Sequence, residues 1–296
     1  MTELLHDLAW VLPLRGELMT ALMHGFSWLG YDKFILLFLP LGYWAWSKPV
    51  FLRLFILVSI TALLNAFLKD LWQDPRPDLA FRLDQQVGES FGAPSGHSQI
   101  AVVLWLWLAY EMRRTWGWAL AGFITLGVIF SRLYLGAHDL EDVLAGSALG
   151  AATLVVFALV KDWPVWRSQN VLWHMALVIL VVAPALLCWP GVAPYYVPML
   201  SGMLLGVLAG YWLETRQLDF YTQTQLWRRV LAAVIGCVAF LLLQAGLKKL
   251  GAHLVWPDML WQSLRGVLMG LFIAVLVPWL LVQMRLLPAR RRAPSA

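Results

Sequence analysis

The chain has 296 residues, of which 61% are hydrophobic and 13% charged, and its formal net charge is +5 at pH 7. A soluble domain fills its core with a smaller apolar share, so this composition excludes a soluble enzyme and predicts an integral membrane protein. The basic residues form no stripe interleaved with base-stacking aromatics, and nucleic acid is therefore not expected as a partner.

The first 30 residues predict an amphipathic helix that lies in the membrane interface. Arg15 and Glu17 interrupt the apolar pattern there, which suits an interfacial helix better than a tenth span. The segment MTELLHD is net acidic and no small-residue cleavage site follows it, so no cleavable signal peptide is expected. Whether residues 1–30 span the membrane is left open by the sequence.

Nine apolar segments follow, and each predicts a helix that crosses the bilayer. They lie near residues 31–47, 50–68, 97–112, 116–133, 142–160, 171–189, 195–213, 230–247 and 266–284. The predicted fold class is therefore all-α: a polytopic transmembrane helix bundle of about nine spanning helices plus the N-terminal interfacial helix.

The distribution of Lys and Arg predicts the orientation of these helices. If the loop between the first two spans is cytoplasmic, 13 of the 22 basic residues fall on that side. They are Lys48, Arg53, Arg113, Arg114, Lys161, Arg167, Arg216, Arg228, Arg229, Arg285 and Arg290 to Arg292. Residues 69–96 and 131–142 are then expected on the outer, periplasm-like face.

Polar residues gather at the outer end of the second span, where charge is costly and usually has a function or a partner. The stretch KDLWQDPRP covers residues 69–77 and contains the cations Lys69 and Arg76. Pro75 and Pro77 flank Arg76, so the helix must end before them and the backbone there is extended. Taken alone, a lysine snorkelling at a helix end explains this stretch equally well.

The third span opens with a second polar stretch, APSGHSQ, residues 93–99. Ser95 can cap the helix, and Gly96 allows a ligand to approach the backbone closely. Unpaired N–H groups at a helix start favour a bound anion, and His97 lies in the first turn, pointing at that anion. A capped helix with an incidental histidine is the ordinary alternative.

The third polar stretch is SRLYLGAHDLED, residues 131–142. His138 and Asp142 are four residues apart, which on a helix places them on one face, where the carboxylate can fix the tautomer of the imidazole. Arg132 ends the preceding span and can return toward His138, where its guanidinium suits a tetrahedral oxyanion. A His–Asp pair that only caps a helix leaves Arg132 unexplained.

Together the three stretches supply cations, a helix N-terminus with a hydroxyl, and two histidines of which one has an acidic partner. This set fits phosphoryl transfer through a covalent intermediate, with one imidazole attacking phosphorus and the other protonating the leaving oxygen. The sequence has no acidic cluster suited to Mg²⁺ and no Cys/His set spaced for Zn²⁺, so a metal-independent reaction without a cofactor is expected.

The three ordered blocks resemble the signature of the type 2 phosphatidic acid phosphatases, a family of membrane lipid phosphatases, over roughly residues 30–160. The resemblance implies that His138 is the nucleophile, that Asp142 orients it and that His97 is the general acid. The phosphate-binding residues that it implies are Lys69, Arg76, Ser95, Gly96 and Arg132. The implied reaction removes a terminal phosphate from a membrane lipid such as undecaprenyl diphosphate, phosphatidic acid or phosphatidylglycerophosphate.

This resemblance divides the chain into an N-terminal helix (1–30), a phosphatase-like transmembrane core (31–165) and a four-helix transmembrane extension of unknown role (166–296). The expected location is a bacterial inner membrane, and the distribution of Lys and Arg puts the active site on the periplasmic face. The sequence does not identify the lipid, the oligomeric state or protein partners. Three other functions remain open: phosphotransfer to a second lipid, vanadate-dependent haloperoxidase chemistry and non-enzymatic transport.

The extension repeats parts of the core. LLNAFLKDL at 63–71 recurs as LLQAGLKKL at 242–250, and the extension lacks a PSGH-like block, so we interpret it as a partial repeat without catalysis of its own. Small residues recur at four-residue steps and predict close helix packing. These steps are Gly146 and Gly150; Gly202, Gly206 and Gly210; and Gly266 and Gly270.

Overall fold

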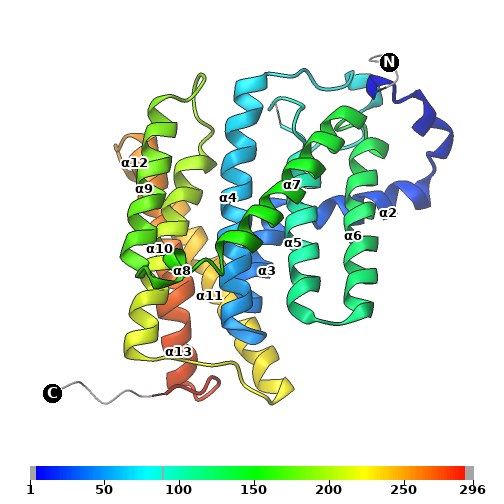
Figure 1. Cartoon of the computed structure of the whole chain (residues 1–296). Helices are drawn as coiled ribbons and strands as arrows, with labels where there is room; N and C mark the ends of the chain where they lie inside the picture. Colours follow the sequence, from blue (N-terminus) through cyan, green and yellow to red (C-terminus); the bar gives the residue numbers. More distant parts are fainter. Residues whose placement is uncertain (1–4, 89, 291–296) are drawn as a thin grey trace. The chain divides into compact units, whose positions relative to one another are not determined.

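The computed structural model describes residues 5–88 and 90–290 and confirms the all-α fold class. Within these residues, the regular structure is helical apart from one isolated bridge between Phe220 and Ala289 (Figure 1). Residues 1–4 of the predicted N-terminal helix and Arg291 and Arg292 of the basic tail lie outside the described residues.

The chain divides into two compact units, which are described separately. The first comprises residues 1–35, 60–163 and 189–192, and the second comprises 36–59, 164–188 and 193–296. The boundaries predicted at residues 30 and 165 remain predictions.

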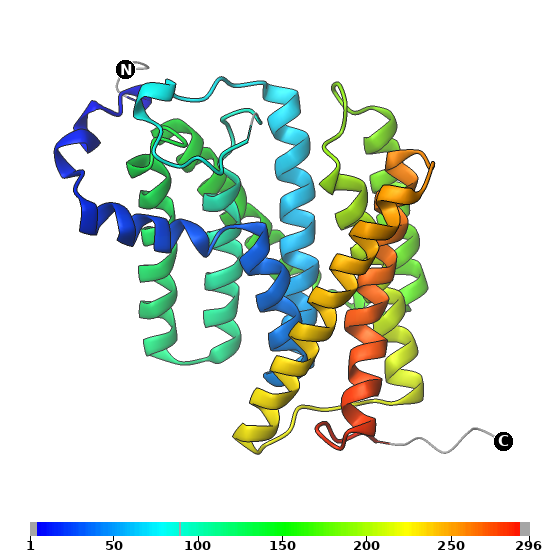
Figure 2. The same ribbon diagram turned by 180° about the vertical axis from the view of Figure 1, so that it is seen from behind.

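The first unit contains a short 3₁₀ helix, η1 (Ala9–Leu14), and the helices α2 (Glu17–Trp28), α5 (Gly96–Met112), α6 (Thr115–Tyr134) and α7 (Leu140–Val160). Helix α5 packs against both α6 and α7, whereas α2 lies crosswise on α6 (Figure 2). The 12 residues of α2 reach only about 18 Å, which is too short for a hydrocarbon core of about 30 Å. Its place in the membrane interface remains a prediction.

The second unit is built mainly from the C-terminal helices. These are α8 (Pro164–Ser168), α9 (Val171–Leu187), α10 (Tyr196–Gln217), α11 (Leu226–His253), α12 (Asp258–Leu271) and α13 (Val277–Gln283). A π-helical turn, Phe272–Leu276, joins α12 to α13. The indole N–H of Trp44 donates to the carbonyl of Ile273 (2.8 Å) and so provides a partner where the regular ladder is interrupted. Helices α3 (Asp32–Ala45) and α4 (Lys48–Trp72) contribute residues to both units.

All nine predicted spans are helical, and six of them are long and apolar enough to cross a membrane. These six are α4, α6, α7, α10, α11 and the continuous stretch 258–283. The other three are shorter: α3 has 14 residues, and α5 and α9 have 17 each. The protein is therefore a polytopic helical membrane protein, and the total of nine crossings remains a prediction.

The predicted close helix packing at glycine steps is confirmed in both units. A Cβ atom on Gly202 would lie 2.1 Å from the carbonyl oxygen of Ser263, and one on Gly266 would lie 1.9 Å from that of Met199. Helices α10 and α12 are thus in backbone contact, as small residues permit between membrane helices. In the first unit, a Cβ on Gly146 of α7 would lie 2.4 Å from the carbonyl oxygen of Ser95.

We expect Gly146→Ala to destabilise the protein and displace the start of α5, because the added methyl group collides with the backbone of Ser95 rather than with a movable side chain. Overpacking of this kind costs about 1–3 kcal/mol. Thermal unfolding in detergent should show a lower midpoint. Gly122→Ala is the matched control, since a Cβ on this α6 glycine meets nothing within 4 Å. An equal midpoint for the two variants would contradict the packing argument.

Candidate active site

The ends of four helices bring the three polar stretches together in the first unit. Helix α4 ends at Trp72, α5 begins at Gly96, α6 ends at Tyr134 and α7 begins at Leu140. Consecutive helices run in opposite directions, so these ends lie on one side of the unit. The backbone N–H of Ser95 donates to the carbonyl of Asp142 (2.9 Å), which ties the start of α5 to the first turn of α7.

The imidazole of His138 is bound to the carboxylate of Asp142, with 2.7 Å between Nδ1 and Oδ2. The contact differs from the predicted pair on one helix face, because His138 precedes the helix and Asp139 is its N-cap. Asp139 and Asp142 form a capping box, in which each side chain accepts from the backbone N–H of the other. Asp142 therefore fixes both the helix start and the imidazole.

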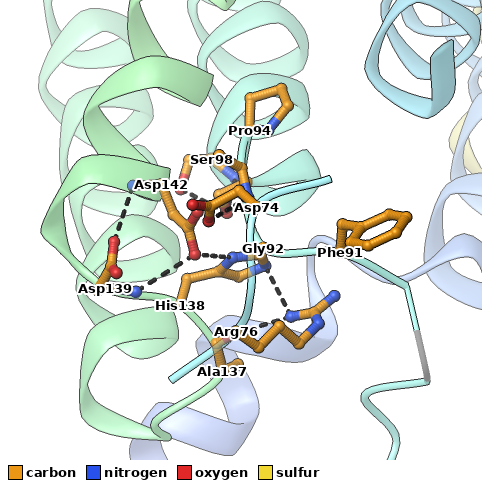
Figure 3. Close-up of polar contacts among 12 residues, drawn as sticks. Asp74, Arg76, Phe91, Gly92, Pro94, Ser98, Ala137, His138, Asp139 and Asp142 are labelled. Atoms are coloured by element: carbon orange, nitrogen blue, oxygen red, sulfur yellow. Dashed lines mark hydrogen bonds and ion pairs between the residues drawn. The ribbon is translucent and has the colours of Figure 1, made fainter. Parts of the chain in front are cut away.

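Arg76 lies on the opposite side of the His138 ring, as Figure 3 shows. Its Nη1 lies 3.3 Å from Nε2 of His138 and donates to the carbonyl of Ala137 (2.7 Å). A guanidinium only donates and a carboxylate only accepts, so the two contacts of the ring agree with one neutral tautomer. The proton lies on Nδ1, facing Asp142, and the lone pair lies on Nε2, facing Arg76.

Burial and positive charge keep His138 neutral. The imidazole is buried, and burial together with the positive charges of Lys69, Arg76 and Arg132 lowers its pKa well below the ordinary value of 6.5. Burial, followed by the charge of Arg132, also lowers the pKa of Arg76 to about 10, which leaves the guanidinium charged at neutral pH. The site thus combines a neutral imidazole with the charged guanidinium of Arg76.

Lys69, in the last turn of α4, holds the backbone of the loop that precedes α5. Its ammonium group donates to the carbonyls of Phe91 and Gly92, at 2.5 Å each. Asp74 supports the same segment, because its Oδ2 accepts from the N–H of Ala93 (3.2 Å). An ammonium has three donors, so Lys69 can hold this loop and still donate to a phosphate, which is its predicted role.

The predicted helix cap at Ser95 is confirmed. Its Oγ accepts a long hydrogen bond from the N–H of Ser98 (3.5 Å) and one from the Ser98 hydroxyl (3.1 Å). Asn65 of α4 donates to the carbonyl of Pro94 (3.0 Å), and a Cβ on Gly96 would lie 3.0 Å from the Asn65 Oδ1. Close packing against α4 therefore adds a second reason for glycine at position 96.

His97 lies in the first turn of α5, as predicted. The ring packs edge-on against Tyr31, with 4.6 Å between the centroids, and a Cβ on Gly30 would lie 2.5 Å from it. Its Nε2 is buried and makes no hydrogen bond within residues 5–88 and 90–290. An unbonded imidazole nitrogen in this position can donate to or accept from a bound substrate.

Arg132 is buried within the unit and has a carboxylate partner that the sequence did not indicate. Its Nη1 donates to Oδ2 of Asp84 (2.8 Å) and to the hydroxyl of Ser27 (2.5 Å). The Tyr31 hydroxyl donates to the same carboxylate. Burial alone would raise the pKa of Asp84, but the bond from Tyr31 and the charge of Arg132 outweigh it and lower that pKa.

The N-terminal segment also reaches the site, which the sequence did not reveal. His6 Nδ1 lies 2.6 Å from Oδ2 of Asp139, the N-cap of α7. This hydrogen bond and the charge of Asp139 raise the pKa of His6. Arg15 donates to the carbonyls of Phe81 (2.6 Å) and Tyr134 (3.0 Å). Contacts between residues this far apart in the chain have no signature in spacing or composition.

Family comparisons match both halves of the chain. The PAP2 superfamily matches residues 50–166, and the family described as PAP2 superfamily phosphatase, transmembrane extension, matches residues 198–291. The first range contains all eight predicted site residues. The second coincides with most of the predicted four-helix extension.

Individual relatives cover different shares of the chain. Phosphatidylglycerophosphatase B of Bacillus subtilis is 34% identical over 164 residues, which are 51% of this chain and 76% of that protein. Sphingosine-1-phosphate phosphatase 2 of Mus musculus is 28% identical over 204 residues, which are 63% of this chain and 56% of that protein. The chain thus spans little more than half of the mouse relative.

A solved structure also matches. The crystal structure of a transmembrane PAP2 type phosphatidylglycerolphosphate phosphatase from Bacillus subtilis is 25% identical, with a TM-score of 0.46. The match covers 52% of this chain and 82% of that one.

Helices long enough to span a membrane end on one side of the first unit, where the pair of His138 and Asp142 lies among buried cations. These features define an integral membrane protein suited to binding an anion. The family match and the bacterial relative identify the class more narrowly. The chain belongs to the PAP2 superfamily of phosphatases.

Asp142→Asn should lower the rate of phosphate release by about 100- to 10,000-fold, the usual range for loss of acid–base catalysis. The amide cannot replace the carboxylate that accepts the Nδ1 proton of His138. Initial rates of phosphate release measure the effect. Glu141→Gln is the control, because this neighbouring carboxylate is half exposed and pairs with His6. Equal rates for the two variants would contradict the role of Asp142.

The pH dependence of activity should report the positive charges around His138. The neutral imidazole is the reactive form, so kcat/KM falls when the pH drops through the pKa of His138, which lies well below 6.5. Lys69→Met removes one of the charges that lower this pKa, and the acidic limb of the profile should therefore move to higher pH. Lys33→Met, at an exposed position, should leave the limb unchanged. A limb that stays in place or moves to lower pH in Lys69→Met would refute the electrostatic account.

Proposed function

We propose that the protein is a membrane lipid phosphate phosphatase that works through a phosphohistidine at His138. The observation that carries this proposal is the pair of contacts of the His138 ring, with Asp142 at Nδ1 (2.7 Å) and Arg76 at Nε2 (3.3 Å). These contacts direct a lone pair on Nε2 toward a guanidinium, which is where an anionic phosphate would bind.

In the first step, Nε2 of His138 attacks phosphorus and the bond from phosphorus to the lipid oxygen breaks. Arg76, Lys69 and Arg132 are the proposed ligands of the phosphate oxygens, together with the hydroxyl of Ser95 and the backbone N–H of Gly96. The weak 3.3 Å bond between Arg76 and His138 gives way to bonds from Arg76 to the substrate. Asp142 stabilises the positive charge that develops on the imidazole.

His97 completes this step as the general acid. It transfers a proton to the leaving oxygen, and the lipid leaves as an alcohol when the substrate is a monophosphate or as a lipid monophosphate when the substrate is a diphosphate. In the second step, water attacks the phosphohistidine, the N–P bond breaks and inorganic phosphate leaves, while the neutral His97 accepts the proton of the water. The buried and otherwise unbonded Nε2 of His97 supports this role, because no hydrogen bond within the described chain has to be broken first.

The position of the site supports a lipid substrate. The site lies at the ends of α4, α6 and α7, which are long and apolar enough to span a membrane, so a lipid headgroup can reach it while the tail stays in the bilayer. We place the site on the periplasmic face of a bacterial inner membrane, because the basic residues lie mainly in the loops on the opposite side.

The names of the bacterial and mouse relatives, a phosphatidylglycerophosphatase and a sphingosine-1-phosphate phosphatase, agree with a lipid phosphate. Undecaprenyl diphosphate and glycerophospholipid phosphates are the preferred candidates.

Purified protein in detergent should release phosphate from at least one member of a panel of lipid phosphates and diphosphates, and His138→Ala should reduce release to background. With ³²P-labelled substrate and an acid-free quench, the wild-type protein should carry label that is stable in alkali and lost in acid, as expected for phosphohistidine. His138→Ala should carry none.

The destination of the label separates hydrolysis from phosphotransfer. Label in free phosphate supports the phosphatase, whereas label on a second lipid would replace it with a phosphotransferase. Phosphate release that survives in His138→Ala would overturn the proposed nucleophile.

A further inference from the structure

A cavity of about 280 Å³ lies beside the proposed phosphate site. Its lining includes Arg76, Arg82, Val87, Ser90 and Phe91, all of them in the segment between α4 and α5. The volume corresponds to roughly nine molecules of liquid water at about 30 Å³ each. A diphosphate group, with two phosphorus and seven oxygen atoms, fits within this volume.

Arg76 and Arg82 are the two cations of this cavity's lining, and the proposed mechanism uses only Arg76. The Nε of Arg82 is buried and makes no hydrogen bond within the part of the chain that the structure describes. A buried donor without a partner is costly, and a bound ion is one way to satisfy it. Arg82 lies outside the three signature stretches, so the family resemblance assigns it no role.

The backbone on both sides of Arg82 is held in place. The carbonyl of Phe81 accepts from Arg15 (2.6 Å), and the N–H of Leu83 donates to the carbonyl of Leu135 (2.9 Å). One residue further on, Asp84 is paired with Arg132 (2.8 Å). A cation presented from a fixed backbone loses little entropy when it binds an anion.

The charges around the cavity favour a second anion. Arg76 and Arg82 are close enough that the charge of Arg82 contributes, after burial and the charge of Arg132, to the lowered pKa of Arg76. The carboxylate of Asp74 also lines the cavity, but it already accepts from the N–H of Ala93 (3.2 Å). An anion between the two guanidinium groups would remove their repulsion.

We propose that Arg82 is a specificity-determining residue that binds the second phosphate of a lipid diphosphate, the one attached to the lipid. This inference rests on the proposed phosphatase activity and deepens it. Arg76 contacts both phosphates, and the terminal one is transferred to His138. When the bridging P–O bond breaks, the leaving lipid monophosphate gains negative charge, which Arg82 stabilises. The ammonium group of a sphingoid phosphate would instead be repelled by Arg82.

The experiment compares two substrates with the same tail, farnesyl diphosphate and farnesyl monophosphate, in the same detergent. Arg82→Gln keeps hydrogen-bonding capacity but removes the charge. We expect kcat/KM for the diphosphate to fall by about 10- to 100-fold, the range for losing a hydrogen bond between charged groups, while the value for the monophosphate changes less than about threefold. Arg114→Gln is the control, since Arg114 is exposed and lies between α5 and α6, at their other ends.

Each outcome has one meaning. An equal loss on both substrates would show that Arg82 only maintains the loop, and no loss on either would show that it does not touch the substrate; both overturn the proposal. A wild-type protein that hydrolyses the monophosphate but not the diphosphate would also overturn it, while leaving the phosphatase proposal intact. Failure of the wild-type protein on both substrates and on the wider lipid panel would reject the phosphatase proposal itself.

Discussion

The proposed chemistry depends on the direction in which one imidazole faces. The ring of His138 lies between an acceptor, the carboxylate of Asp142 at 2.7 Å, and a donor, the guanidinium of Arg76 at 3.3 Å. Neither partner can exchange roles with the other, because Asp142 cannot donate when ionised and Arg76 cannot accept. The fold maintains this arrangement from both sides: Asp142 belongs to the capping box of α7, and Arg76 is fixed by the carbonyls of Ser90 and Ala137.

The cations of the site have different hydrogen-bond partners, and this difference fits their proposed roles. Lys69 and Arg76 donate to backbone carbonyls, which stabilise a charge without neutralising it. Arg132, at 1% exposure, is instead paired with the carboxylate of Asp84. Breaking a buried pair by removing one partner is strongly destabilising. Arg132 therefore stabilises the fold in addition to its proposed role as a phosphate ligand, whereas the charges of Lys69 and Arg76 are not neutralised by their carbonyl partners.

The sequence predicted those parts of the site that depend on local spacing. The Ser95 cap, the contact between His138 and Asp142 and the helix end before Pro75 follow from a few consecutive residues, and glycines four residues apart predicted backbone contact between helices. Asp84, Tyr31 and His6 could not be predicted, because each meets its partner across 48 or more residues and no periodicity connects them. The position of His138 just before α7, rather than within it, depends on the capping box of Asp139 and Asp142, which the spacing of His138 and Asp142 alone does not reveal.

The N-terminal segment acquires a more specific role than that of a membrane anchor. Its predicted amphipathic character accounts for a helix near the membrane surface, but not for contacts with residues of the loop and of α7. Arg15 holds the carbonyl of Phe81, next to Arg82, and His6 holds Asp139, next to His138. The same segment thus supports both the residue proposed to select the substrate and the residue proposed to attack it. Since α2 is packed on α6, which ends at the site, the support is anchored to a spanning helix. One short stretch of chain, which carries none of the signature residues, thus contacts the sequence neighbours of both Arg82 and His138.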